Sequence, residues 1–332
     1  MRRIALNIAL LAVTSLLTLG VAEAGARHAY RAPWYMRLLG DQVRNQKLPY
    51  HLHRWGLRGV DYPPKESGAT RVFLIGDSFT FGLGVREDPL VMPAILERSI
   101  GVEVLNGGLS GSHTRDWVEL LERVGPEFEP DIVTAVFFLR DGTLIDAMGS
   151  FFRPIRDKVA RRNENSRLYR HVYLYRLWRD AVDRRRVGAM YASALVRAYA
   201  GDSTETREWQ AAQRNLLTMK ALAAKRHAKF AMIVYPVLAD LEGPYPFQEI
   251  CDTLVAFAQR NAIPVHNLLD DFRGQQGPDL WVSAFDQHPN QKAHAIAAHG
   301  IEPFVRRLIG QTPMAGGRAG DVPDTGRYRV RD

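Results

Sequence analysis

The run Gly76-Asp77-Ser78 has the residue types of a turn that presents a reactive serine. It directly follows the apolar run 72–75, which indicates a buried strand. Ligands of open α/β sheets bind outside the carboxyl ends of the strands, so Ser78 is expected at the rim of a sheet. Gly-Asp-Ser is also ordinary turn composition. Taken alone, the run therefore predicts either a nucleophile or a simple turn.

A second polar run, Asp286-Gln-His-Pro-Asn290, lies near the end of the chain and before an amphipathic stretch. A serine nucleophile needs a base within hydrogen-bond reach, and that base needs a group that orients it. His288 follows an acidic residue at close spacing and is expected in a loop. We therefore predict Ser78 as the nucleophile, His288 as the general base and Asp286 as the acid.

Three blocks of this chain together resemble the SGNH/GDSL hydrolases. They are Gly76-Asp77-Ser78, Asn106-Gly-Gly-Leu-Ser-Gly111 and Asp286-x-His288-Pro-Asn. The piece Trp55-Gly-Leu-Arg-Gly59 is similar to the segment before the first block in membrane-anchored bacterial members. The resemblance covers roughly residues 50–310. It implies a flavodoxin-like fold and the hydrolysis or transfer of acyl esters, often on carbohydrate.

The resemblance also implies an oxyanion hole built from the backbone amides of Ser78 and Gly111. Each such donor is worth ~3–4 kcal/mol of barrier. The family's third block usually adds an Asn side chain, and this chain has Arg140 at that position. An arginine there donates to the oxyanion, binds an anionic substrate group or points away. Asp77 is expected to brace the turn.

The spacing of the acid is a second departure from the family pattern. The usual acid lies three residues before the histidine, and Phe285 occupies that position. Asp286, two residues before, is the natural substitute. A Ser–His dyad oriented by a backbone carbonyl is the other possibility.

Apolar runs alternate with amphipathic stretches from residue 71 onward. The expected strands are 72–75, 102–105, 132–139, 230–235 and 263–268. The expected helices are 89–99, 116–124, 205–228, 247–261 and 291–309. Strands that are apolar throughout indicate a parallel sheet covered on both faces. The sequence therefore predicts a three-layer α/β/α sandwich, the flavodoxin-like SGNH hydrolase fold, plus an inserted helical cap.

The same pattern predicts the domain boundaries. Residues 1–27 are a signal anchor or signal peptide, and 28–70 form an irregular segment rich in Arg, Pro and aromatic residues. The hydrolase domain spans 71–309. The interval between its third and fourth strands is about twice what one crossover helix needs, so residues 142–203 are expected to be a helical insertion. The Gly- and Pro-rich tail 310–332 is expected to be disordered.

Arg2 and Arg3 precede an uncharged run from Ile4 to Ala22, which is the pattern of an export signal. The run is long enough to span ~30 Å of hydrocarbon, so an uncleaved anchor is favoured slightly. Ala22-Glu23-Ala24 has the small-x-small pattern of a cleavage site. We expect the remaining chain to be periplasmic, tethered to the inner membrane or secreted if the leader is cleaved.

The formal net charge of +8 at pH 7 is concentrated in one segment. Residues 151–190 hold twelve Lys/Arg against four Asp/Glu, so the remaining chain is close to neutral. An exported protein meets little nucleic acid and no nucleic-acid module is recognisable, so nucleic acid is not expected as a partner. The basic segment is a solvated helical face, a site for anionic lipid or acidic polysaccharide, or a cap over Ser78.

Two classes of function fit these features. The first is an esterase, deacetylase or O-acyltransferase that acts on an acylated carbohydrate or another small ester. The second is a catalytically degenerate domain that binds polysaccharide or helps assembly, which Arg140 suggests. The retained pair Ser78 and His288 favours the enzyme. No cofactor and no metal is expected, because the sequence contains no metal-ligand cluster, nucleotide loop or dinucleotide fingerprint.

Overall fold

The computed structural model describes residues 2–143, 151–200 and 204–310. The chain forms two compact units. The sheet unit contains Asp41–Leu144 and Ala194–Asp332, and the N-terminal unit contains Met1–Gly40 and Ile145–Ser193. Each unit is described by itself.

The sheet unit is built on five parallel strands in the order β2-β1-β3-β4-β5. Their bounds are Arg71–Gly76 for β1, Glu103–Gly108 for β2, Ile132–Phe138 for β3, Lys229–Tyr235 for β4 and Val265–Asn267 for β5. Strands β1 and β3 are buried along their whole length, as expected for a sheet covered on both faces. The direction of winding changes between β1 and β3, and such a switch point is where α/β sheets bind ligands.

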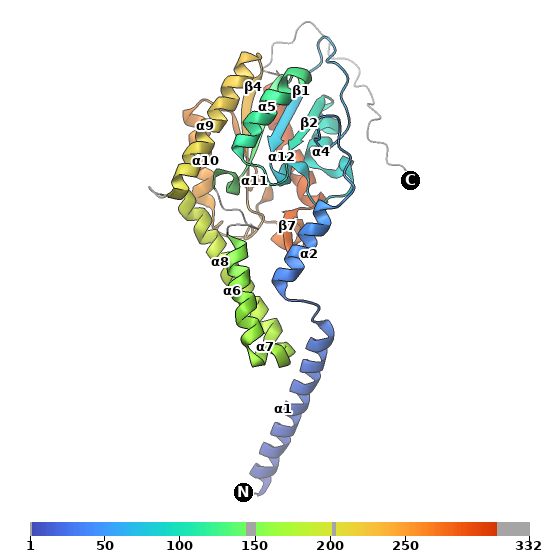
Figure 1. Cartoon of the computed structure of the whole chain (residues 1–332), viewed down its shortest axis with the longest axis vertical. Coiled ribbons are helices and arrows are strands. Elements are labelled where there is room, and N and C mark those ends of the chain that lie inside the picture. The colour runs from blue at the N-terminus through green and yellow to red at the C-terminus, as the bar shows by residue number, and fades with distance from the viewer. Residues whose placement is uncertain (1, 144–150, 201–203, 311–332) are drawn as a thin grey trace. The chain divides into compact units, whose positions relative to one another are not determined.

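Two layers of helices cover this sheet (Figure 1). Helices α4 (Met92–Ile100) and α12 (Gln291–Gly310) pack against each other on one side. Helix α5 (Thr114–Phe128) packs against α9 (Thr204–Lys225), and Trp209 of α9 contacts Phe257 of α10 (Gln248–Arg260). The predicted three-layer α/β/α sandwich is confirmed.

The long elements and the short strand β5 agree with the sequence-based predictions, and several other short elements were missed. The missed helices are α3 (Ser78–Phe81) and α11 (Leu269–Phe272). A two-stranded antiparallel sheet of β6 (Trp281–Ser283) and β7 (Asp286–Pro289) was also missed. His288 therefore lies on a short strand, and its prediction as a loop residue is wrong. Elements of three or four residues are too short to show a hydrophobic period.

The segment 28–70, predicted to be irregular, contains helix α2 (Trp34–Gln46). The better-buried face of this helix carries Trp34 at one end and the polar residues Asp41 and Asn45 at the other. Trp34 and Leu38, like Tyr35 and Leu39, lie four residues apart, so the sequence carried a helical signal that the prediction overlooked. The remainder, up to β1, contains only an isolated bridge between Leu52 and Arg58.

The described part of the insertion is helical, as predicted, and forms α6 (Phe152–Asn165), α7 (Arg167–His171) and α8 (Tyr173–Tyr199). Residues 145–193 belong to the N-terminal unit with α1 (Arg2–Ala29), whereas the sequence placed them inside the hydrolase domain. A role as a cap over Ser78 stays a prediction. The expected disorder of the tail concerns 311–332, which lie outside the described residues.

Candidate active site

Ser78 is the first residue of α3, and Asp77 separates it from strand β1. Asp77 is the helix N-cap, because its Oδ1 accepts a hydrogen bond from the Phe79 N–H at 2.8 Å. The N–H of Ser78 itself has no acceptor within the helix, since the first N–H groups of a helix never do. Asp77 thus braces the turn, and Ser78 Oγ lies 3.4 Å from its Oδ2.

The turn packs closely against its two neighbouring strands through glycines. A Cβ on Gly76 would lie 2.1 Å from Thr80 Oγ1, and one on Gly108 would lie 2.0 Å from Phe81 N. Asn106 accepts a hydrogen bond from the Gly108 N–H at 3.0 Å, which shapes the end of β2 where α3 rests. Side chains larger than hydrogen would push α3, and Ser78 with it, off the sheet.

His288 reaches Ser78 from strand β7. Its Nε2 lies 3.0 Å from Ser78 Oγ, and its Nδ1 lies 2.5 Å from Asp286 Oδ1. Residues two apart in a strand point to the same face, so an acid two before the histidine suits this extended backbone. A carboxylate at Nδ1 holds the proton there and leaves Nε2 able to accept the serine proton. The structure brings together the three predicted residues.

The carboxylate of Asp286 is buried, and it has a hydrogen-bond partner in addition to His288. Its Oδ2 accepts a hydrogen bond from the Asn45 side-chain amide at 2.6 Å, and its Oδ1 also accepts from the His288 backbone N–H at 3.2 Å. Burial alone would raise the pKa of Asp286. The hydrogen bonds from His288, its charge when protonated and the hydrogen bond from Asn45 together lower that pKa below its ordinary value. Asp286 is therefore held in its ionised form.

Asn45 belongs to α2, and sequence reasoning did not find it. A second residue of the same helix, Asp41, accepts a hydrogen bond from the Ser283 hydroxyl at 2.5 Å. Ser283 in turn accepts from the backbone N–H of Asp286 at 3.1 Å. The Tyr50 hydroxyl donates to the backbone carbonyl of Asn45 at 2.7 Å. The last turns of α2 thus hold the β6–β7 hairpin through side chains that have no motif in the sequence.

Gly111 lies in the loop after β2, and this loop is tied to the end of β1. The carbonyl of Gly76 accepts from the Leu109 N–H at 2.9 Å and from the Ser112 hydroxyl at 3.4 Å. Gly111 has a φ of 80°, a left-handed conformation that glycine adopts without strain. The loop that carries this predicted oxyanion residue is therefore fixed beside the Ser78 turn.

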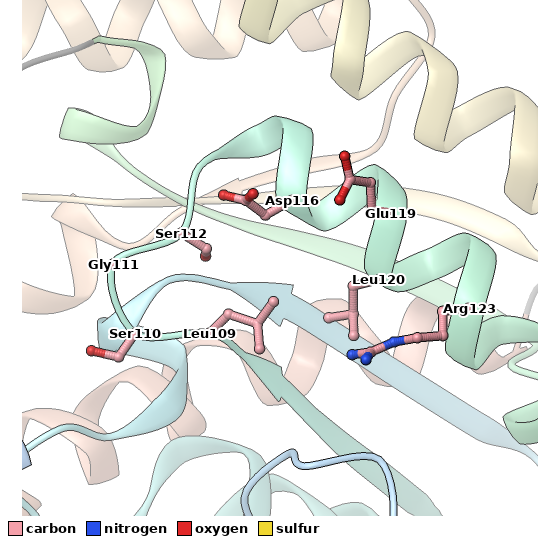
Figure 2. A pocket seen from close by; sticks show the side chains of 8 residues that line it. All are labelled: Leu109, Ser110, Gly111, Ser112, Asp116, Glu119, Leu120 and Arg123. Atoms are coloured by element: carbon pink, nitrogen blue, oxygen red, sulfur yellow. The ribbon is translucent and has the colours of Figure 1, made fainter.

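An open pocket of about 490 Å³ lies between this loop and helix α5 (Figure 2). Its lining comes from Leu109, Ser110, Gly111 and Ser112 of the loop and from Asp116, Glu119, Leu120 and Arg123 of α5. Most of these side chains are polar or charged. The pocket thus offers hydrogen-bond donors and acceptors next to Gly111.

Arg140 lies in a short 3₁₀ turn after β3, and its side chain is mostly buried. Its guanidinium donates a hydrogen bond to Asp77 Oδ2 at 3.0 Å and lies 3.7 Å from Asp141 Oδ1. Burial and the charge of Asp77 raise the pKa of Asp141 well above its ordinary value, and Arg140 opposes this shift. The structure thus shows Arg140 turned towards the carboxylate that precedes Ser78, and the roles considered for it from the sequence stay predictions.

A second arginine, Arg58, supports the loop that follows the Ser78 turn. Arg58, within Trp55–Gly59, is buried and donates to the carbonyls of Gly82 and Val85, each at 2.7 Å. It also pairs with Asp88 at 2.7 Å. Arg58 thus holds the loop that follows α3. The Trp55–Gly59 motif was noted in the sequence, but its role was not.

The turn that carries Ser78 and the hairpin that carries His288 both lie within one family match. Residues 74–296 match the model of the GDSL-like Lipase/Acylhydrolase family. The chain belongs to this family. The resemblance read from the three sequence blocks is confirmed, and the protein is a hydrolase that acts on ester bonds. The match contains Ser78, Gly111, Arg140, Asp286 and His288, whereas Asn45 and Arg58 lie before it.

Several solved structures are similar to this chain over most of their own length. They include TesA (17% identity, 72% of this chain and 99% of that chain, TM-score 0.45) and the lipase/acylhydrolase from Enterococcus faecalis (19%, 75% and 100%, 0.41). A third is the esterase EstA from Pseudoalteromonas sp. (14%, 73% and 100%, 0.43). A comparison with curated proteins found no match.

Two further side chains of reactive type, His294 and Cys251, are buried in the fold. His294 accepts a hydrogen bond from the Met92 N–H at 3.1 Å, and burial lowers its pKa to about 3. Burial raises the pKa of the Cys251 thiol to about 12. Within the described ranges, no group of three or more His, Cys, Asp and Glu side chains gathers as a metal site would require.

Proposed function

We propose that GDSL chemistry in this chain uses Ser78 as the nucleophile, His288 as the general base and Asp286 as the group that orients it. One observation carries the proposal: the continuous contact from Asp286 Oδ1 through both ring nitrogens of His288 to Ser78 Oγ. Nucleophile, base and orienting acid at hydrogen-bond distances are the signature of an activated serine.

In the acylation step, Ser78 Oγ attacks the ester carbonyl carbon while His288 Nε2 takes the hydroxyl proton. The carbonyl π pair moves to the oxygen, and the N–H groups of Ser78 and Gly111 stabilise the resulting oxyanion. Collapse of the tetrahedral intermediate breaks the bond to the alcohol oxygen, and His288 returns the proton to that oxygen. Asp286 stabilises the imidazolium in between.

In the deacylation step, a hydroxyl attacks the acyl-serine while His288 takes its proton. The bond between the acyl carbon and Ser78 Oγ then breaks, and His288 returns the proton to Ser78 Oγ. Water gives the free acid, and an alcohol of a second substrate gives a new ester. Both reactions share the acyl-serine intermediate, so the chain is proposed as an esterase or deacetylase with O-acyl transfer as the variant. In both, Arg140 acts by neutralising the charge of Asp77, the residue that precedes Ser78.

We propose an O-acyl group on an envelope carbohydrate as the substrate. Support comes from the open pocket beside Gly111, whose Ser110, Asp116, Glu119 and Arg123 side chains suit a polyhydroxylated alcohol better than an acyl chain. The apolar α1 is compatible with a signal sequence or a membrane anchor, and supports a periplasmic location.

The second candidate is a polysaccharide-binding or assembly domain without catalysis. The observation that favours it is Arg140 in place of the usual amide donor, since its guanidinium is engaged by Asp77. Binding of a polysaccharide does not require Ser78 Oγ and His288 Nε2 to lie at hydrogen-bond distance, so the enzyme remains the preferred function.

The test is a fluorophosphonate probe on the full-length protein in detergent, followed by peptide mapping. Labelling at Ser78 that is lost in both Ser78→Ala and His288→Ala is expected. His299→Ala changes an exposed histidine of α12 and should label normally. No labelling of a folded protein would move the assignment to the binding domain. The unfolding free energy of Ser78→Ala should equal that of the wild type, because Ser78 is at the rim of the sheet.

The substrate class needs its own assay. Acetylated oligosaccharides should be turned over with a higher kcat/KM than p-nitrophenyl esters of increasing chain length. Preference for long acyl chains over acetylated sugar would contradict the carbohydrate proposal and leave the Ser78 mechanism standing.

A further inference from the structure

Helix α1 of the N-terminal unit is apolar, and its C-terminal end contacts α7 and α8 (Figure 1). Helix α1 passes the length and composition test for a membrane span, and its apolar side chains are exposed from Ile4 to Val21. A signal sequence passes the same test, so the contacts of residues 23–30 are what separate a leader from an anchor.

Glu23 is the first residue after the apolar run, and its carboxylate caps the start of α8. It accepts hydrogen bonds from the backbone N–H groups of Tyr173 at 2.7 Å and Leu174 at 2.9 Å. Carboxylates at a helix N-terminus satisfy N–H groups that have no helical partner. The helix start therefore depends on a residue that cleavage after Ala24 would remove.

The following residues extend the same junction. Ala26 is buried, and the Tyr30 hydroxyl contacts the Tyr169 hydroxyl at 2.9 Å and donates to Asp180 at 3.1 Å. Tyr169 also donates to Asp180, at 2.8 Å. The outer end of α1 and the α7–α8 junction are thus one packed structure. A leader destined for removal needs no such contacts.

The segment 166–179 at this junction, called the tip, has a composition suited to a membrane surface. It contains four arginines, three tyrosines, three leucines and one tryptophan, and neither Asp nor Glu. Leu168 is 58% exposed and Trp178 is 56% exposed, which is unusual for large apolar side chains of a folded unit. Arg167 and Arg170 are exposed on either side of Leu168.

We propose that α1 is retained as a membrane anchor and that the tip docks on anionic lipid headgroups. Nineteen residues from Ile4 to Ala22 rise about 28 Å as a helix, nearly the thickness of the hydrocarbon core. Glu23 then lies at the edge of the hydrocarbon core. Its hydrogen bonds to Tyr173 and Leu174 hold the tip at the same depth relative to the membrane. Tyrosine, tryptophan and arginine are the residues that prefer this interfacial layer.

The exposed apolar residues decide between lipid and an acidic polysaccharide as the occupant. An acidic polysaccharide pairs with arginines, but it does not provide an apolar environment for the exposed Leu168 and Trp178 beside them. A bilayer surface accommodates both, because arginines bind phosphates while apolar and aromatic side chains enter the interface.

Docking is tested with full-length Leu168→Cys carrying a polarity-sensitive fluorophore. The native Cys251 is buried, so the label goes to residue 168 alone. The protein is placed in nanodiscs of phosphatidylcholine with or without phosphatidylglycerol, and acrylamide quenching is measured. Phosphatidylglycerol should shield the label, and Arg167→Glu/Arg170→Glu should abolish the effect, because each arginine contributes about fivefold to the docked-to-free ratio.

Arg185→Glu/Arg186→Glu is the matched control, since these exposed residues lie about 18 Å further along α8 from Tyr173. It should keep the response to phosphatidylglycerol. Equal quenching with and without phosphatidylglycerol would overturn lipid docking. Shielding by a soluble acidic polysaccharide but not by phosphatidylglycerol would overturn it in favour of the other occupant.

Anchor retention is read from the intact mass of the protein purified from membranes. A chain that keeps residues 1–24 is expected, and a chain that begins at Gly25 would overturn retention. Glu23→Ala should raise amide exchange at residues 173 and 174, whereas Glu164→Ala, an exposed acid of α6, should not. Both readouts are independent of catalysis.

Discussion

The turn that carries Ser78 and the hairpin that carries His288 differ in what holds them. The turn is shaped by backbone contacts with adjacent strands, above all the close approach of Phe81 to Gly108. The hairpin is held by side chains from far away in sequence, because Asn45 reaches Asp286 and Asp41 reaches Ser283. The serine half of the site is thus set by steric exclusion, and the histidine half by hydrogen bonds.

This difference has consequences for how each half tolerates change. A carbon added at Gly108, where the Ser78 turn rests, would collide with the backbone of Phe81. This backbone cannot move without shifting the strand. Removing one hydrogen bond behind His288 leaves the fold intact and changes only the position and the pKa of Asp286. We therefore expect lesions in the turn to act on stability, and lesions behind the hairpin to act on kcat.

The largest effect is expected from Asp286→Asn. The amide presents the wrong group to His288 Nδ1 and favours the unproductive tautomer, so kcat should fall roughly 10³–10⁴-fold. Burst kinetics with an activated ester should show the loss in the acylation step. A fall of less than tenfold would indicate the dyad oriented by a backbone carbonyl that the sequence left open.

Gly108→Ala should break the other half of the site. Its Cβ would lie 2.0 Å from Phe81 N, so α3 must move, and we expect a loss of about 3 kcal/mol of unfolding free energy or more. Chemical denaturation measures it. Gly243→Ala is the control, because its Cβ would meet nothing within 4 Å. Wild-type stability of Gly108→Ala would refute the steric account of the turn.

Arg140→Asn restores the residue type usual in the family and removes the partner of two buried carboxylates. Stability should fall by about 2–4 kcal/mol, because Asp77 and Asp141 lose their compensating charge. Adding Asp141→Asn should recover part of this loss in thermal unfolding. Arg115→Asn removes a surface pair and should cost little. Activity per folded molecule is expected to persist, and its collapse would mark Arg140 as a substrate contact.

The smallest effect is expected from Asn45→Ala, which should lower kcat about 10–100-fold with KM unchanged. Val43→Ala alters an exposed residue of the same helix and should have no effect. The pKa of Asp286 is lowered in the folded state, so its contribution to stability is present above pH ~4 and is lost as pH falls through the folded pKa. Without Asn45 this pKa rises towards its unfolded value, so the loss of stability should be smaller and should be complete at a higher pH in urea titrations. An unchanged kcat would show that Asn45 does not position Asp286.

How well the sequence predicted each part follows from how local its cause is. Strands β1 and β3 are buried on both faces, so their apolar runs were visible and their positions were predicted. Ser78 and His288 were found because each lies in a short block with a known order. Helix α2 was overlooked although its apolar residues recur at helical spacing, whereas the contacts of Asn45 and Asp41 could not be predicted because their partners lie far away in the sequence.

The sequence by itself determined the fold class and the family, and it predicted the three residues of the proposed triad. These rest on hydrophobic periods and on blocks that contact their neighbours in the chain. The tertiary structure decided the partner of Arg140, the contact of Asn45 with Asp286 and the grouping of residues 145–193 with the N-terminal helix. Each of these joins residues far apart in the chain through a few hydrogen bonds, and no local pattern records such a pairing.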